Sequence, residues 1–199
     1  MLHIGIDFSI TSPCICFWDS RYEHTFENSS FFFLSSSNTH KNFDFPKNIT
    51  FEDTSSSKNN PVRFSENAEK LTNKILAEIE SVRKFNILLE GYSMGAKGRL
   101  FDIGEATGIF KYFLSNNNLN VATVAPTAIK KMATGKGNAN KFLMLEKFTE
   151  INIELKSSEW IKKLTTEKHL LSPLTDIVDS FFIANSSTVV YDQGKFSSR

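Results

Sequence analysis

The order in which apolar runs and amphipathic segments follow one another is the feature that most constrains the fold. Three apolar runs of strand length come first, at residues 2–8, 13–18 and 30–34. Beyond residue 60, apolar runs alternate with stretches whose apolar residues recur at helical spacing. Successive strands indicate hairpins, whereas alternating strands and helices indicate parallel crossovers. We therefore expect an α/β domain of three layers, a mixed five-stranded sheet with helices on both faces.

The second half of the chain supplies the remaining predicted elements. Between residues 61 and 83, apolar residues such as Ile75 and Ile79 recur every four positions, which predicts an amphipathic helix. Pro173 occupies a favoured first helical position after Ser172, a candidate N-cap, and begins the last predicted helix. The other predicted elements are strands at 86–89 and 120–124, helices at 101–114, 127–133 and 139–149, and a last helix at 173–187.

Length and composition indicate one folded domain over residues 1–199, because 199 residues with 19 Phe can bury a sizeable core. From about residue 35 to residue 60 the chain is rich in Ser, Asn, Thr and Lys, which predicts a long flexible insertion. No apolar run approaches the roughly 18 residues that a membrane helix needs. The N-terminus has no basic region before its apolar run, so we expect a core strand there and no signal peptide.

The two cysteines, Cys14 and Cys16, are two positions apart on a predicted strand, so their side chains point to the same face. This spacing suits small buried apolar residues better than a disulfide. No histidine adjoins them, which disfavours a zinc site. We therefore expect an intracellular, reduced protein.

Four carboxylates occupy positions from which they can converge. Asp7 ends the first predicted strand and Glu90 follows the strand at 86–89; functional groups of α/β sheets gather beyond such strand ends. Asp176 and Asp179 are three positions apart and share one face of the last helix. Such acids repel one another unless cations neutralise them, and hard oxygen ligands suit a pair of Mg²⁺ or Mn²⁺ ions. Each acid alone also has a simpler explanation, as a turn cap or as a complement to the helix dipole.

Positive charge is concentrated between residues 127 and 147. The cations there are Lys130, Lys131, Lys136, Lys141 and Lys147, against Glu146 alone. Such a run is either a solvated helix face or a phosphate-binding surface. Gly135 and Gly137 permit close backbone approach, so Lys136 and nearby amides could contact a phosphate. The pattern is not a P-loop, and nucleotide hydrolysis is unsupported.

Four parts of the chain resemble the RuvC-like Holliday-junction resolvases of the ribonuclease H superfamily. They are residues 4–9 (Ile-Gly-Ile-Asp-Phe-Ser), 89–92 (Leu-Glu-Gly-Tyr), 125–131 with 135–141, and 176–184. The third part is the most specific, since it is similar to the family's Pro-x-x-Val/Ile-Lys stretch followed by Gly-x-Gly-x-Ala-x-Lys. The resemblance covers nearly the whole chain except residues 20–60.

This resemblance implies a ribonuclease H-like fold, a homodimer and Mg²⁺-dependent nicking of four-way DNA junctions in recombination, repair or phage DNA processing. The products would carry 5′-phosphate and 3′-hydroxyl ends. It also implies residue roles: Asp7 would bridge two metal ions, Glu90 would ligate one, and Asp176 and Asp179 would complete the set. Lys130 and Lys141 match the family's DNA-contacting lysines.

Three features remain open within this resemblance. The family often places an aromatic wedge just after its Glu, and the candidates here are Tyr92 and Met94. The insertion at about 35–60 is longer than the family's connection. The helix at 101–114 has a broad apolar stripe, which is either core or the dimer contact that the family forms around this helix.

The alternatives are a nuclease of the same fold that acts on flaps, forks or hybrid duplexes, and a junction-binding protein without cleavage. A third is a fragment of an actin-like sugar kinase, since residues 5–9 are compatible with that superfamily's first phosphate loop; the chain's length argues against it. We expect a cytoplasmic location in a bacterium or a phage-infected host cell, with no membrane association.

Overall fold

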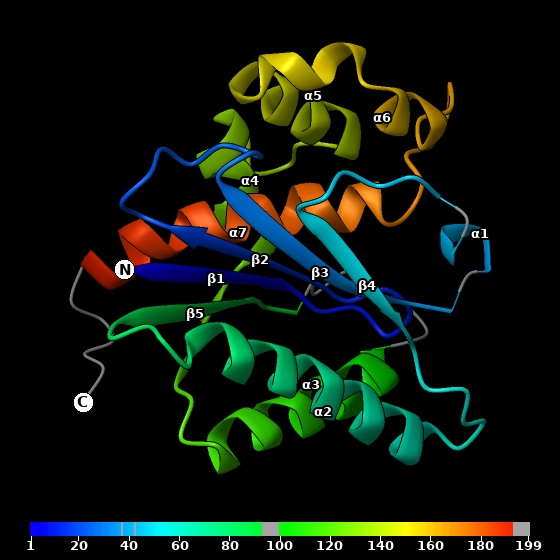
Figure 1. The fold of residues 1–199 in the computed structure, drawn as a ribbon, viewed down its shortest axis with the longest axis vertical. Helices are drawn as coiled ribbons and strands as arrows, with labels where there is room; N and C mark the ends of the chain where they lie inside the picture. Colours follow the sequence, from blue (N-terminus) through cyan, green and yellow to red (C-terminus); the bar gives the residue numbers. More distant parts are fainter. Residues whose placement is uncertain (37, 42, 93–99, 193–199) are drawn as a thin grey trace.

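A central sheet organises the computed structural model, which describes residues 1–36, 38–41, 43–92 and 100–192. Within these residues the sheet has six strands in the order β4-β3-β2-β1-β5-β6 (Figure 1). The strands are β1 (Leu2–Asp7), β2 (Cys14–Asp19), β3 (Ser29–Ser35), β4 (Ile49–Asp53), β5 (Phe85–Glu90) and β6 (Val121–Val124). The mixed sheet and its two helical layers confirm the predicted α/β class.

The sheet combines the two connection types expected from the sequence. β1, β2 and β3 form antiparallel pairs, whereas β1 pairs in parallel with β5, and β5 in parallel with β6. In the β1–β5 register, Ile6 lies opposite Leu89. Asp7 and Glu90 are the next residues of these strands, so both lie at the same edge of the sheet.

The prediction of five strands is wrong by one, because the segment predicted as an insertion contributes β4. This strand pairs in parallel with β3, and the helix α1 (Asn38–Lys41) lies between the two in sequence. Ile49 is buried, and the Phe51 ring stacks on Phe33 with 5.3 Å between centroids. Two apolar residues in a polar segment were too weak a signal for a strand. That the rest of the insertion is flexible stays a prediction.

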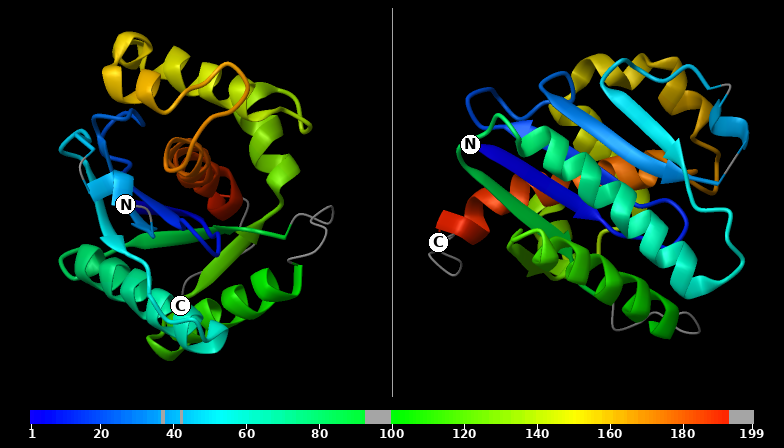
Figure 2. Two further views of the ribbon diagram at one scale, coloured as in Figure 1. Left: turned by 90° about the vertical axis from the view of Figure 1, so that its right-hand side faces the viewer. Right: turned by 60° about the horizontal axis from the view of Figure 1, so that its bottom comes forward.

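Helices cover both faces of the sheet (Figures 1 and 2). Helices α2 (Asn60–Ile79) and α3 (Leu100–Asn116) lie on one face. On the other face lie α4 (Pro126–Thr134), α5 (Lys141–Ile151) and α7 (Leu174–Asp192), with the short η1 (Ile153–Ser157) and α6 (Glu159–Lys163). Each predicted helix is present, and α7 extends beyond its predicted end. None of the helices in the described ranges is long and apolar enough to cross a membrane.

Alternation along β1 sets the position of α7. Ile4 and Ile6 are buried in the cluster beneath α2 and α3, so Gly5 and Asp7 face the opposite layer. A Cβ on Gly5 would lie 2.2 Å from the Ala184 amide nitrogen and 2.4 Å from the Ser180 carbonyl oxygen. Only glycine permits this approach, which brings the acids of α7 close to the end of β1.

Gly5→Ala is expected to destabilise the protein by about 1 to 3 kcal/mol, because its methyl group would overlap the backbone of α7. Urea unfolding measures this change. Gly104→Ala is the matched control, since a Cβ there would meet nothing within 4 Å. Equal stability of the two variants would contradict the proposed close packing.

Candidate active site

The acids and two of the lysines predicted from the sequence lie together in one pocket of about 430 Å³. The acids come from three elements: Asp7 ends β1, Glu90 ends β5, and Asp176 and Asp179 lie in the first turns of α7. Their functional roles stay predictions, but the convergence on which these roles depend is present. The other charged residues of the pocket are Lys130 of α4 and Lys141, the first residue of α5.

Burial and mutual repulsion make the acids unusually hard to ionise. Burial, followed by the charges of Asp179, Asp176 and Glu90, raises the pKa of Asp7 well above its ordinary value. Burial also raises the pKa of Glu90 to about 7 and that of Asp179 to about 6. A divalent cation would offset both the burial and the mutual repulsion that raise these pKa values.

Asp176 is held by hydroxyl groups. Its Oδ2 accepts hydrogen bonds from Ser12 Oγ at 2.8 Å and from Ser172 Oγ at 2.5 Å, and its Oδ1 accepts one from Thr175 Oγ1 at 3.3 Å. Burial raises the pKa of Asp176, and the bonds from Ser172 and Ser12 oppose the rise. Only 8% of Asp176 is exposed, so it is more than a solvated acid at the start of a helix.

The donor set fits a hard divalent cation, but the side chains are not yet arranged around one. Within the part of the chain that the structure describes, no three His, Cys, Asp or Glu side chains form a group that could hold a metal ion as they stand. Uncompensated carboxylates repel one another, which opposes their close approach when no cation is bound. Carboxylate oxygens are the ligands that Mg²⁺ and Mn²⁺ prefer, so the residue types in the pocket fit such an ion.

In EDTA, wild-type protein should lose stability relative to Glu90→Gln as the pH rises from about 4.5 to about 7. Folded protein binds the Glu90 proton more tightly than the unfolded chain does, so ionising Glu90 costs stability across this window. Thermal unfolding of both proteins measures the difference, and Mg²⁺ should reduce it above pH 7. A difference that is independent of pH would contradict the raised pKa.

Two of the predicted DNA-binding lysines face the acids. Lys130 and Lys141 both lower the pKa of Glu90 and of Asp179, which places their positive charges within electrostatic reach of the pocket. Lys136 is exposed in the turn after α4, where Gly135 has a φ of 77°, and it is not among the pocket-lining residues. Its predicted phosphate contact would therefore lie outside the acidic pocket.

Tyr92, a candidate wedge, lies two residues beyond β5 and is 44% exposed. The Lys111 ammonium lies 5.6 Å from the centroid of its ring. An exposed aromatic ring next to a cation is compatible with base stacking, so its DNA contact stays a prediction. Met94, the other candidate, lies outside the described residues.

Sequence reasoning missed the hydroxyls around Asp176. Ser172 was predicted to be an N-cap, but its hydroxyl donates to the Asp176 side chain. Ser12, from the loop after β1, was not singled out at all. The Ser12 amide donates to Ser9 Oγ at 2.9 Å, which closes a local turn. A serine three positions before another serine could have indicated this turn. The contact between Ser12 and Asp176 joins residues 164 positions apart, and no local pattern shows it.

Solved structures share this fold. The chain matches Thermus thermophilus RuvC with a TM-score of 0.56 and 16% identity, covering 98% of this chain and 97% of that one. For T. thermophilus RuvC in complex with a Holliday junction substrate, the TM-score is 0.55 and the identity 15%, over 98% and 96% of the two chains. For the yeast mitochondrial Holliday junction resolvase Ydc2, the TM-score is 0.50 and the identity 15%, and the match covers 96% of this chain and 78% of Ydc2.

No protein-family model and no curated protein matches the sequence. The structural similarity confirms the resemblance in fold: the chain has the ribonuclease H-like fold of RuvC over nearly its whole length. The β4 strand is an addition to the five-stranded sheet expected from that resemblance.

Proposed function

We propose that this protein is a divalent-metal-dependent endonuclease that nicks four-way DNA junctions. The observation that carries the proposal is the single pocket in which four carboxylates and two lysines meet. It is supported by the RuvC fold, which one neighbour uses to bind a Holliday junction substrate. Such an activity would serve DNA recombination, repair or phage DNA processing, and we propose that the protein acts in the cytoplasm.

Asp7, Glu90, Asp176 and Asp179 would hold the metal ions. When bound, a pair of Mg²⁺ or Mn²⁺ ions supplies activation of a water and stabilisation of the leaving oxygen in phosphodiester hydrolysis. Asp7 would contribute to holding both ions, because it lies at the end of the central strand β1, beside Glu90 of β5 and the acids of α7. By the resemblance to RuvC-like resolvases, the cut would leave a 5′-phosphate and a 3′-hydroxyl.

The lysines would position the DNA. Lys130 and Lys141 line the acidic pocket, where they can bind the phosphates that flank the cut. Lys136, on the exposed turn after α4, would bind a phosphate farther along the same strand. Such contacts supply affinity and register without choosing a sequence. Tyr92 would stack on an unpaired base at the crossover.

We further infer that the protein acts as a homodimer through α3. The outer face of this helix carries Phe101 at 86% and Tyr112 at 67% exposure. Between them lies the exposed Gly108, where a Cβ would meet nothing within 4 Å. Apolar rings around a glycine allow two helices to approach closely, and two active sites related by a twofold axis suit the near-symmetric arms of a junction.

Gly108→Arg is expected to convert the dimer into a monomer, because a long charged side chain would occupy the centre of the proposed α3 contact. Sedimentation velocity measures the mass. Asn73→Arg, an equal change of charge at an exposed position of α2, should leave the dimer intact. If wild type is monomeric, or if Gly108→Arg stays dimeric, the α3 contact is wrong.

A substrate panel tests the proposed function. Labelled four-way, flap, fork and hybrid duplexes would be incubated with the protein and either Mg²⁺ or EDTA. We expect Mg²⁺-dependent cutting that is fastest on the four-way junction. If flaps, forks or hybrids are cut faster than the four-way junction, the same site has that structure as its preferred substrate. If the protein binds the junction but cuts none of the substrates, with or without Mg²⁺, it is a junction-binding protein and not a nuclease.

A further inference from the structure

His40 connects the added segment between β3 and β4 to the start of α7. It lies on α1, is buried, and has its Nδ1 2.6 Å from Ser35 Oγ and its Nε2 3.2 Å from the Ser172 carbonyl oxygen. Figure 1 shows α1 at the end of the molecule where α7 begins. The residue thus joins the last position of β3 to the turn that precedes α7.

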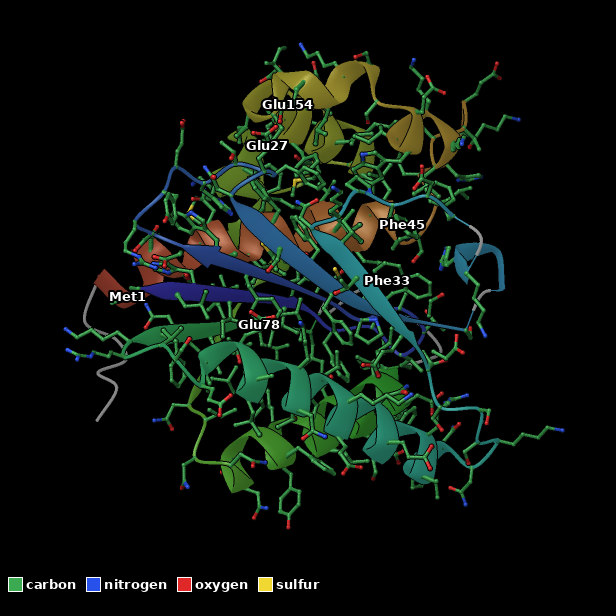
Figure 3. All side chains as sticks on the ribbon, viewed as in Figure 1. Met1, Glu27, Phe33, Phe45, Glu78 and Glu154 are labelled. Atoms are coloured by element: carbon green, nitrogen blue, oxygen red, sulfur yellow. The ribbon has the colours of Figure 1, made fainter. Side chains whose placement is uncertain are left out.

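The partners determine which ring nitrogen carries the proton. A carbonyl oxygen can only accept, so Nε2 is the protonated nitrogen and donates to Ser172. In the neutral ring, Nδ1 then accepts from the Ser35 hydroxyl. The ring also lies edge-on to Phe33 and Phe45, at centroid distances of 5.7 Å and 6.1 Å. Both phenylalanines are labelled in Figure 3; Phe33 belongs to the apolar cluster that also contains Phe181 of α7, and Phe45 packs against this cluster.

The hydrogen bonds continue from Ser172 to the pocket. The same residue whose carbonyl accepts from His40 donates its hydroxyl to Asp176 Oδ2 at 2.5 Å. We propose that His40 is a positioning residue: it holds the backbone of Ser172 so that the Ser172 hydroxyl orients Asp176 for cation binding. The proposal rests on the proposed function only in taking Asp176 as a metal ligand.

The added segment is anchored well enough to support this role. β4 pairs with β3 up to Ser35, opposite Asp53, and the Thr54 amide donates to the Ser35 carbonyl at 3.0 Å. Ser35 therefore has its backbone held by β4 and its hydroxyl held by His40. The segment predicted as a flexible insertion thus supplies a support for a carboxylate of the pocket.

Three variants separate the hydrogen bond from the packing. His40→Phe keeps a ring against Phe33 and Phe45 but removes both hydrogen bonds. His40→Gln places an amide nitrogen near the position of Nε2 and can still donate to Ser172. His24→Phe is the matched control, because His24 is a half-buried histidine whose ring stacks on Phe181 at 3.9 Å and lies tilted against Trp18 at 4.3 Å between centroids, and it does not line the pocket.

The readouts are Mn²⁺ affinity by calorimetry on DNA-free protein, and the Mg²⁺ concentration that gives half-maximal cutting. Groups that orient a ligand typically contribute about 10- to 100-fold in metal affinity, and His40 acts one residue farther out. We therefore expect His40→Phe to weaken Mn²⁺ binding about five- to tenfold, His40→Gln to recover most of the loss, and His24→Phe to match wild type.

Each outcome decides one claim. Unchanged Mn²⁺ affinity in His40→Phe, or an equal loss in His24→Phe, would overturn the positioning role. An equal loss in His40→Gln, which can still donate to the Ser172 carbonyl, would show that this hydrogen bond does not set the Mn²⁺ affinity and would also overturn the role. Wild type that binds Mn²⁺ but cuts no DNA would overturn the proposed function, while the order of affinities among the variants would still decide the role of His40.

Discussion

Asp7→Asn should slow junction cutting by about a thousandfold or more, which corresponds to a rise of about 4 kcal/mol in the activation barrier. Asp7 lies at the centre of the acidic pocket, where its pKa responds to Asp179, Asp176 and Glu90. Asparagine keeps the shape of the side chain but removes one ligand charge, so metal binding should weaken. Cutting rates measured at saturating protein, where every junction is bound, isolate this effect.

Junction binding is expected to survive this change, because Lys130 and Lys141 are untouched. Binding of Asp7→Asn to labelled junction should equal or exceed that of wild type, since one repulsive charge is gone from the pocket. Asp19→Asn is the control: it makes the same substitution at the end of β2, where Asp19 pairs with Arg21. If Asp7→Asn cuts as fast as Asp19→Asn, the metal-site assignment is wrong.

Replacing Lys130 and Lys141 together with Ala should weaken binding to every DNA sequence and flatten its dependence on salt. Each lysine that neutralises a phosphate contributes about one unit to the slope of log affinity against log salt concentration, so the double variant should lose about two. Both lysines face the acidic pocket, so the double loss should also slow cutting at saturating DNA. Titrations at several salt concentrations measure the slope.

Lys70→Ala with Lys74→Ala is the matched control, because it removes two positive charges from α2 on the opposite face of the sheet. This control should retain the slope of wild type. An unchanged slope in the Lys130 and Lys141 variant would refute their phosphate contacts.

The parts of the site that could be predicted are those set by local pattern. Asp7 and Glu90 follow short apolar runs, and parallel pairing of such strands brings their ends together. Asp176 and Asp179 share a helix face because they are three positions apart. The order of the elements predicted the remaining architecture, since strands and helices differ in the spacing of their apolar residues.

The parts that could not be predicted depend on contacts between distant positions. The strand β4 could not be predicted because it lies in a polar stretch of the sequence. The contact that places it, the stacking of Phe51 on Phe33, forms only in the folded chain. His40 and Ser172 are 132 positions apart, and only the folded chain brings them together. Gly5 lies in a segment that resembles the family's first strand, but the sequence does not show why a glycine is needed there. The folded chain does, because the backbone of α7 lies directly against Gly5.

The central claim is that the four-carboxylate pocket cuts four-way junctions, and mapping of the nicks tests it most directly. A junction labelled in turn on each strand would be incubated with wild-type protein and Mg²⁺, then analysed on a denaturing gel and treated with DNA ligase. We expect paired nicks at symmetric positions near the crossover that ligase seals without further processing. Intact strands in Mg²⁺, or equal cutting in EDTA, would contradict the claim.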